Sequence, residues 1–297
     1  MTATIAAPPR LKPKPRTREA KAARRQDFLV WVARYSLLIA LGVMFMGPLL
    51  FVFLTSVMSS QQALTADFWP NSWHWGSYAD VFTETPMLRH LGNTLLYAGL
   101  ATTFMLISSI GPAYAFSRLR WRGRNKVFVA VLMTMMLPPQ VTIVPMYVLW
   151  TRYELTGSLW PLIIPNLFGD AFSIFLLRQF LLTIPKEYSD AAKVDGCNEF
   201  QVLWRVILPM ARPAIAATAM FMFFFAWNDY FGPLLYTSEN RENWPLSLAL
   251  ASFRGQYQVD WNITMAATLL VMAPVMIVFF FAQKAFVEGV TLTGVKG

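Results

Sequence analysis

Residues 190–209 read DAAKVDGCNEFQVLWRVILP and lie between two long apolar stretches of the chain. Pro185, just before this segment, is a residue favoured in the first turn of a helix, and Gly196 can adopt the left-handed conformation that ends one. Asn198 can cap a second helix, with Gln201 as its partner in a capping box. The segment therefore predicts two short helices joined by a sharp turn.

The two predicted helices present different faces. Ala191 and Ala192 give the first helix small side chains, which would let the backbone of another protein approach closely. An apolar stripe at helical spacing should hold the second helix against the rest of the protein; its members are Phe200, Leu203, Trp204 and Ile207. The alternative is an amphipathic hairpin resting on anionic lipid, which charge repulsion disfavours. The acids concerned are Glu187, Asp190, Asp195 and Glu199.

Composition places the flanking stretches in a membrane. Hydrophobic residues make up 56% of the 297 residues and charged residues only 14%, against about 25% charged in a soluble domain. Crossing a bilayer takes about 20 apolar residues, and six blocks of this chain are long enough. We place these blocks near residues 30–57, 91–116, 127–150, 158–182, 213–236 and 262–284.

The distribution of positive charge predicts the topology. The first 28 residues hold eight Lys or Arg and two acids, and the loop 118–126, RLRWRGRNK, holds four Arg, one Lys and no acid. Loops 60–90 and 237–261 hold only one and two Arg. Because positive loops stay on the cytoplasmic side, both termini and residues 183–212 are expected inside. The predicted fold is an all-α integral membrane protein of six transmembrane helices, with a cytoplasmic two-helix segment between helices 4 and 5.

Three regions follow from this topology. Residues 1–28 form a basic, Pro-rich cytoplasmic tail that is expected to be disordered. Residues 29–287 form the six-helix transmembrane domain, with the two-helix segment at 184–212, and residues 288–297 form a cytoplasmic C-terminal tail. A net charge of +9 would suggest nucleic acid in a soluble protein. Here the charge follows the topology, so membrane lipid is the expected partner and nucleic acid is not.

No catalytic or metal-binding cluster is recognisable in the sequence. The two histidines, His74 and His90, are too few for a metal site, and the single Cys197 allows no intrachain disulfide. The C-terminal GVTLTGVK spaces two glycines as in a phosphate loop, but Val295 precedes Lys296 and no hydroxyl residue follows it. We therefore expect neither an enzyme nor a metal or nucleotide cofactor in this chain.

Polar residues within the apolar blocks are candidates for a substrate pathway, since ionisable groups in a membrane usually face a cavity or a partner. Trp227, Asn228 and Asp229 place an aromatic ring, an amide and a carboxylate in consecutive positions. Such groups bind sugars, because the ring stacks on a sugar face and the polar groups bond to hydroxyls. The alternative for Asp229 is hydrogen bonding between helices.

Two further polar positions belong to the same hypothesis. Asn166 and Asp170 are four residues apart, so they would share one helix face, with interhelical hydrogen bonding again the alternative for Asp170. Gln140 follows the prolines of LPPQVTIVP, which predict a broken helix whose freed backbone groups need partners. Gln140 could therefore line the pathway, and a simple packing kink is the alternative.

The cytoplasmic segment also resembles a known family. The pattern E-A-A, three residues, G, nine residues, I-x-L-P is typical of the membrane subunits of ABC importers that work with a binding protein. This chain has DAA at 190–192, Gly196 and VILP at 206–209 at the same spacing, with Asp190 and Val206 at the family's Glu and Ile positions. The resemblance extends from about residue 30 to 297 and is greatest to the smaller permease of maltose-type carbohydrate importers. FFFAWNDYFGPLL, GVTLTGVKG and FWPNSWHWGSYADVF resemble that subgroup.

The resemblance implies a bacterial inner-membrane permease that translocates a carbohydrate. Its expected partners are a second homologous permease, two ATPase subunits that bind ATP and Mg, and an extracytoplasmic sugar-binding protein. It further implies that the two-helix segment is the coupling helix, which docks into a groove of the ATPase. The coupling residues are then Glu187, Asp190, Ala191, Ala192, Asp195, Gly196 and Pro209. The C-terminal tail would reach between the ATPase subunits, through Thr293, Gly294 and Lys296.

Three alternatives stay open at this point. A permease for glycerol-3-phosphate or another polyol would have a similar sequence, although no cation lies clearly within the spans to favour a phosphate. A self-sufficient secondary transporter would show paired repeats and a coupling-ion site, and the sequence has no internal repeat. A membrane-embedded enzyme would need a catalytic cluster, which is not recognisable.

Overall fold

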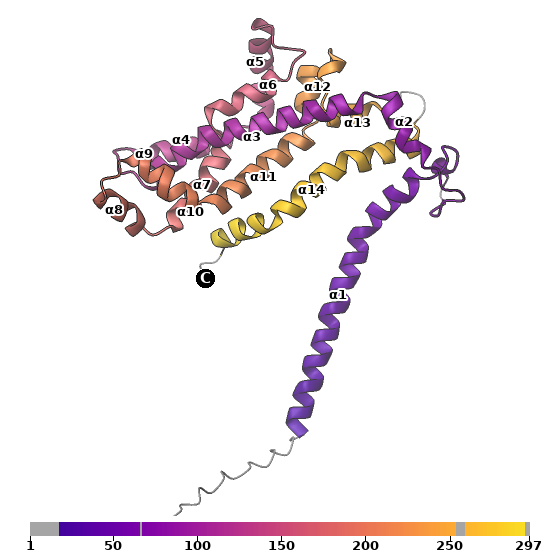
Figure 1. The fold of residues 1–297 in the computed structure, drawn as a ribbon, viewed down its shortest axis with the longest axis horizontal. Coiled ribbons are helices and arrows are strands. Elements are labelled where there is room, and N and C mark those ends of the chain that lie inside the picture. Colours follow the sequence, from indigo (N-terminus) through magenta and orange to yellow (C-terminus); the bar gives the residue numbers. More distant parts are fainter. Residues whose placement is uncertain (1–17, 66, 254–258, 295–297) are drawn as a thin grey trace, which may run out of the picture. The chain divides into compact units, whose positions relative to one another are not determined.

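The computed structural model of the chain describes residues 18–65, 67–253 and 259–294, with side chains described between 27 and 283. Within these ranges all the regular elements are helices (Figure 1). In chain order they are α1 Arg18–Ser56, η1 Gln62–Leu64, α2 Gly76–Glu84, α3 Met87–Ser117, α4 Arg124–Thr134, α5 Pro139–Arg152, α6 Trp160–Ile163, η2 Ile164–Phe168, α7 Ala171–Thr183, α8 Glu187–Val194, α9 Glu199–Val202, η3 Leu203–Ile207, α10 Leu208–Met210, α11 Arg212–Asn228, α12 Phe231–Thr237, η4 Arg241–Asn243, α13 Leu246–Ser252 and α14 Trp261–Gly294.

The chain divides into two compact units, one up to Val52 and one from Phe53 onward. In the first unit the described residues form a single helix, α1, which begins at Arg18. Residues 18–28, predicted to belong to a disordered tail, are therefore helical. Glu19 and the alanines of this stretch favour helix, and the apolar run that follows continues it. Residues 1–17 of the predicted tail lie outside the described residues.

Long apolar helices confirm the membrane prediction. Three helices are long and apolar enough to cross a membrane: Asp27–Ser56, Met87–Ser117 and Trp261–Gln283. Three pairs pass the same test together but bend at a short break: Arg124–Thr134 with Pro139–Arg152 by 85°, Trp160–Phe168 with Ala171–Thr183 by 41°, and Glu199–Met210 with Arg212–Asn228 by 78°. The described chain thus has three candidate spans, or six if each bent pair forms one.

The breaks occur where the sequence cannot continue a helix. The predicted break at the prolines is confirmed, because α5 begins at Pro139 and Pro138 is extended. Pro is favoured at a helix start, where its missing N–H costs nothing. The fifth apolar block, predicted as one stretch over 213–236, is also divided: α11 ends at Asn228 and α12 begins at Phe231. There the backbone N–H of Gly232 donates to Oδ1 of Asp229 at 3.0 Å, so the carboxylate caps the new helix.

Within the second unit, α3 packs against α7 and α11, and α11 packs against α14 (Figure 1). One apolar core lies where these helices meet the shorter helices α8 to α10. It includes Phe116 of α3, Leu177 and Phe180 of α7, and Ile207 of η3. The short helices are therefore part of the same core as the long ones.

The second short helix departs from α-helical geometry. Element η3 is a π-helical turn, and the N–H of Leu208 donates to the carbonyl of Leu203, five residues earlier. The wider turn places Val202 and Ile207, five apart, on the buried face. Phe200 and Trp204 are instead 71% and 64% exposed, and their rings stack on each other. The predicted apolar stripe is thus wrong for these two residues, because it assumed 3.6 residues per turn.

We expect Ile207→Ala and Trp204→Ala to distinguish the observed π-helical register from the predicted α-helical stripe. Ile207 is fully buried, so its truncation should lower the free energy of unfolding by about 2–5 kcal/mol. Trp204→Ala, the matched control in the same turn, should change it by less than about 0.5 kcal/mol. Thermal unfolding of the detergent-purified protein measures both. Equal destabilisation by the two substitutions would support the α-helical stripe instead.

Candidate functional site

The candidate site is the two-helix segment formed by α8 and α9. Helix α8 starts two residues after Pro185, with Glu187 and Asp190 in its first turn, where carboxylates interact favourably with the helix dipole. Gly196 has a φ of +85°, the left-handed conformation that glycine adopts without steric cost. The predicted pair of helices joined by a turn at this glycine is confirmed.

A capping box starts the second helix, as the sequence predicts. The backbone N–H of Gln201 donates to Oδ1 of Asn198 at 2.9 Å, and the N–H of Asn198 donates to Oε1 of Gln201 at 2.9 Å. Both hydrogen bonds satisfy N–H groups that a helix start leaves unpaired. The direction in which α9 leaves the turn is therefore fixed locally.

The predicted coupling residues divide between an exposed and a buried set. Ala192 is only 8% exposed and belongs to the apolar core, so the predicted small face of α8 is reduced to Ala191. The others are exposed at the surface of the segment: Glu187, Asp190, Ala191, Asp195, Gly196 and Pro209. An exposed set joined to a buried anchor can contact a partner while staying attached to the membrane helices.

Polar contacts also tie the segment to the end of α3. The Tyr114 hydroxyl donates to Oε2 of Glu199 at 2.7 Å, and Lys193 forms an ion pair with Oε1 of the same carboxylate at 2.6 Å. Arg118 donates from Nη2 to the carbonyl of Ile184 at 2.6 Å. These contacts link α8, α9 and the linker before them to a single long helix.

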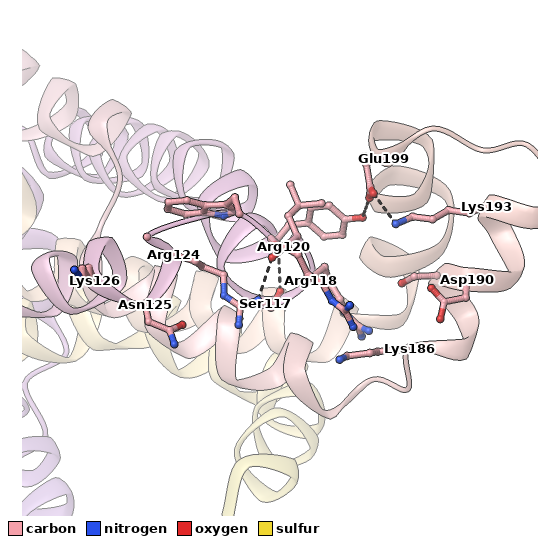
Figure 2. Close-up of a pocket in the computed structure, with 15 residues that line it drawn as sticks. Ser117, Arg118, Arg120, Arg124, Asn125, Lys126, Lys186, Asp190, Lys193 and Glu199 are labelled. Carbon is pink, nitrogen blue, oxygen red and sulfur yellow. Dashed lines mark hydrogen bonds and ion pairs between the residues drawn. The ribbon is translucent and has the colours of Figure 1, made fainter.

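A pocket of about 1120 Å³ lies between α8 and the loop after α3 (Figure 2). We call it the basic pocket; its lining residues include Arg118, Arg120, Arg124, Lys126, Lys186, Lys193, Asp190 and Glu199. Figure 2 shows Arg118, Lys186 and Asp190 at one end and Arg124, Asn125 and Lys126 at the other. The sequence signal was the arginine-rich loop 118–126, which we interpreted only as a topology determinant.

The electrostatics of the basic pocket centre on Arg118. Burial lowers the pKa of Arg118 from its usual value, while the neighbouring Tyr114 and Asp190 raise it. An arginine side chain is not deprotonated in proteins, so Arg118 brings a positive charge into a partly buried position. This charge helps to keep the pocket positive.

The structure separates Asn166 and Asp170, which were predicted to share one helix face. Asn166 belongs to η2 and Asp170 caps α7, because Gly169, with a φ of +88°, ends the first helix between them. Oδ2 of Asp170 accepts hydrogen bonds from the N–H and hydroxyl of Ser173 at 2.7 and 2.6 Å. The Asn166 amide donates to the Leu162 carbonyl at 2.9 Å. Both side chains have internal partners.

The carboxylate of Asp229 is similarly engaged. Its Oδ2 accepts a hydrogen bond from the Tyr97 hydroxyl at 2.9 Å, in addition to the Gly232 N–H on Oδ1. Tyr97 belongs to α3, so this contact joins the break after α11 to another membrane helix. The interhelical alternative for Asp229 therefore has a direct geometric basis.

Trp227 and Asn228 line a second pocket of about 470 Å³ between α11, α13 and α14. Trp227 is 2% exposed and its indole N–H donates to the Val271 carbonyl at 3.3 Å. Asn228 is exposed, and its amide donates to the Phe224 carbonyl at 2.8 Å. Gln140 is exposed in the first turn of α5 and does not line this pocket.

The predicted tail contacts fall at the end of α14. Thr293 and Gly294 are its last two residues, and Lys296 lies outside the described residues. Their predicted role rests on the sequence resemblance alone.

Apolar helices of spanning length, broken at capped positions and joined to a polar two-helix segment, define the class of multi-pass helical membrane proteins. The profile of the family described as "Binding-protein-dependent transport system inner membrane component" matches residues 106–292. The chain belongs to this family. It is accordingly an inner-membrane permease subunit of an ABC importer, and the predicted family is confirmed.

Relatives and solved structures agree with this assignment. The chain is 29% identical to the arabinooligosaccharides transport system permease protein AraQ of Halalkalibacterium halodurans, over 84% of this chain and 91% of that protein. It is 34% identical to the diacetylchitobiose uptake system permease protein DasC of Streptomyces coelicolor, over 70% and 75%. A structure of a bacterial ABC transporter involved in the import of the acidic polysaccharide alginate aligns with a TM-score of 0.78 and 24% identity, over 88% of this chain and 98% of that one.

We expect substitutions at Asp229 to distinguish its structural role from a role in the pathway. Asp229→Ala removes the partner of Tyr97 and the cap of α12, so unfolding should become easier by about 1–3 kcal/mol. Tyr97→Phe removes one of these contacts and should cost less. Asp229→Asn keeps a polar partner for both groups and should stay close to the unsubstituted protein in thermal unfolding and in uptake. Lost uptake in an Asp229→Asn protein of normal stability would assign the carboxylate to the pathway.

Proposed function

We propose that this permease translocates a carbohydrate that an extracytoplasmic binding protein delivers. The support comes from two relatives whose names specify oligosaccharide transport. The pocket beside Trp227 and Asn228 adds to it, since Tyr230, Ser247, Thr264 and Thr268 also line it. The exposed ring of Tyr230 can stack on a sugar ring, and the hydroxyl and amide groups beside it can bond to the sugar hydroxyls. In this proposal Asn228 and Gln140 face the pathway, and Asn166, Asp170 and Asp229 hold its walls together.

The proposed topology has six spans: α1, α3 and α14, the two bent pairs that begin with α4 and with α6, and α11 without the short helices before it. Both termini and the segment 184–212 then lie in the cytoplasm, consistent with the positive charge of loop 118–126. Residues 1–28 form the N-terminal tail, 29–287 the permease domain and 288–297 the C-terminal tail. A bent pair is acceptable in a membrane when protein groups satisfy the freed backbone, as Asp170 does at the start of α7.

The observation that carries the coupling role is the shared core of the two-helix segment and the long helices. Ala192, Val202 and Ile207 are buried in the same cluster as Tyr114 of α3 and Leu177 of α7. Because a close-packed core transmits displacement, a partner that moves α8 will move the helices behind it. The exposed residues from Glu187 to Gly196 would contact that partner.

The proposed partner is an ATPase subunit, and two of these would serve this chain and a second, homologous permease. ATP and Mg would bind in the ATPase subunits, and closing of the ATPase pair would displace α8. The membrane helices would then shift between two states whose populations nucleotide controls. Thr293, Gly294 and Lys296 are proposed to contact the ATPase subunits as well.

Uptake by cells with and without this chain tests the proposal. We expect at least one labelled carbohydrate, from a panel that includes arabinooligosaccharides and diacetylchitobiose, to accumulate only when the chain is present. Gly196→Val should abolish this uptake while the purified complex still hydrolyses ATP. A β-branched residue at a φ of +85° is strained by about 1–3 kcal/mol, which should distort the turn.

Gly196→Asn is the matched control for that variant. No heavy atom lies within 4 Å of the position that a Cβ would occupy at Gly196, and Asn adopts the left-handed conformation more readily than Val. Uptake by Gly196→Asn should therefore stay near normal. Normal uptake with Val would contradict the coupling role, and absence of all carbohydrate uptake in the unsubstituted strain would contradict the carbohydrate proposal.

A bulky residue at Ala191 should release the ATPase subunit. Ala191 is exposed on α8, so Ala191→Trp obstructs close approach without disturbing the core. Ala79→Trp, on the exposed surface of α2, introduces the same side chain on the predicted outer side. Purification in mild detergent with mass spectrometry should recover the ATPase with the unsubstituted chain and with Ala79→Trp, and at least about tenfold less with Ala191→Trp. Equal recovery with all three proteins would argue against docking on α8.

A further inference from the structure

The basic pocket carries more positive charge than its two carboxylates neutralise. Six cations and two carboxylates line it. Lys193 is paired with Glu199, whereas Arg118 and Arg124 donate to the backbone carbonyls of Ile184 and Leu119. The other three cations have no side-chain hydrogen bond or ion pair within the described residues, namely Arg120, Lys126 and Lys186. The pocket therefore holds charges that an anion would neutralise.

Two buried polar groups in the pocket also lack partners. Ser189 is only 7% exposed, and its hydroxyl has no hydrogen-bond partner among the described residues. The Nε of Arg118 is buried and unpaired in the same way. Both residues line the basic pocket. Because a buried polar group without a hydrogen bond is costly, each of these groups needs a partner that the described residues do not supply.

The start of α4 contributes to the same site. This 11-residue helix begins after Gly123, which provides no side-chain cap, and its first residues, Arg124 to Lys126, line the pocket. The free N–H groups and the dipole of a helix start favour an anion, phosphate in particular. Lysine and arginine side chains and a helix start line the same pocket, a combination that attracts a phosphate group.

The position of the pocket favours a phospholipid over a soluble phosphate. The loop 118–123 joins α3, a candidate span, to α4, the first half of another, so the pocket lies at an edge of the membrane. Helix α4 continues from it with exposed apolar side chains at Val127, Val129 and Met133. A phospholipid bound here would have its acyl chains along α4 and its headgroup in the pocket. A soluble phosphate would use only the pocket.

We propose that the basic pocket binds the phosphate of an anionic phospholipid, which bridges the loop after α3 and helix α8. The face of α8 that lines it carries Ser189, Asp190 and Lys193, and Lys186, the N-cap of the helix, continues this face at helical spacing. Of the proposed coupling residues only Asp190 lines the pocket. Ala191 and Glu187 lie on a neighbouring face, so lipid and ATPase can occupy α8 together. The lipid then connects the coupling segment to α3 and α4, and the rate of ATP-driven transport depends on anionic lipid.

Lipid binding to the delipidated transporter complex tests this inference. Native mass spectrometry with added dioleoyl-phosphatidylglycerol measures the dissociation constant of the first bound lipid. The pocket variant is Arg120→Gln/Lys126→Gln/Lys186→Gln, which removes three unpaired cations. Each cation near an anionic headgroup contributes roughly fivefold in affinity, so this variant should bind about a hundredfold more weakly.

The matched control removes the same charge outside the pocket, as Arg122→Gln/Arg205→Gln/Arg212→Gln. These three side chains are exposed and do not line the pocket, and Arg122 belongs to the same loop. The control should keep its affinity for phosphatidylglycerol to within about threefold. Equal weakening of the two variants would overturn the inference, since general surface charge would then explain binding. Unfolding temperatures of both complexes verify that each variant is folded.

Three further outcomes separate the possible ligands. Dioleoyl-phosphatidylcholine should bind more weakly than phosphatidylglycerol, and equal binding would show that the pocket does not recognise an anion. Inorganic phosphate at millimolar concentration should not displace the lipid, and complete displacement would assign the pocket to a soluble phosphate. Loss of the ATPase subunit from the pocket variant, with lipid binding unchanged, would identify the pocket as a protein docking surface and overturn the lipid assignment.

Discussion

The position of the two-helix segment depends on two buried side chains, Val202 at the end of α9 and Ile207 at the end of η3. These side chains share one core with residues of α3, α7 and α11, so the polar two-helix segment is fixed to these three helices by apolar packing. Tyr114 adds a hydrogen bond to Glu199 across the same interface. Close packing makes this region stiff, which is the property that the proposed coupling requires.

Helix ends inside the apolar part of the chain require hydrogen-bond partners for the backbone groups that they expose. A break exposes N–H and C=O groups that lipid cannot bond, and the structure supplies a side chain at each of two breaks. Asp170 caps α7, and Asp229 caps α12 while also accepting from Tyr97. Carboxylates at these positions are costly in a bilayer, and their hydrogen bonds offset that cost.

The parts of the structure that depend on neighbouring residues could be predicted from sequence. Gly196 and Asn198 act within one turn, and both adopt the predicted conformations. Positions whose prediction assumed a continuous helix could not be predicted in this way. Trp204 is exposed because a π-helical turn shifts the register. Gly169 separates Asn166 from the following helix. The basic pocket was missed altogether, because its two walls come from distant parts of the sequence and meet only in the folded chain.

The π-helical turn at Leu203–Ile207 also has a consequence for how the chain can lengthen or shorten. Such a turn contains one residue more than an α-helical turn, so the segment between Gly196 and Pro209 contains one inserted residue. Exchanging its i→i+5 hydrogen bonds for i→i+4 bonds would turn one side of the helix against the other by about 100° and advance it by about 1.5 Å. The joint between the two-helix segment and α11 can thereby combine rotation with translation.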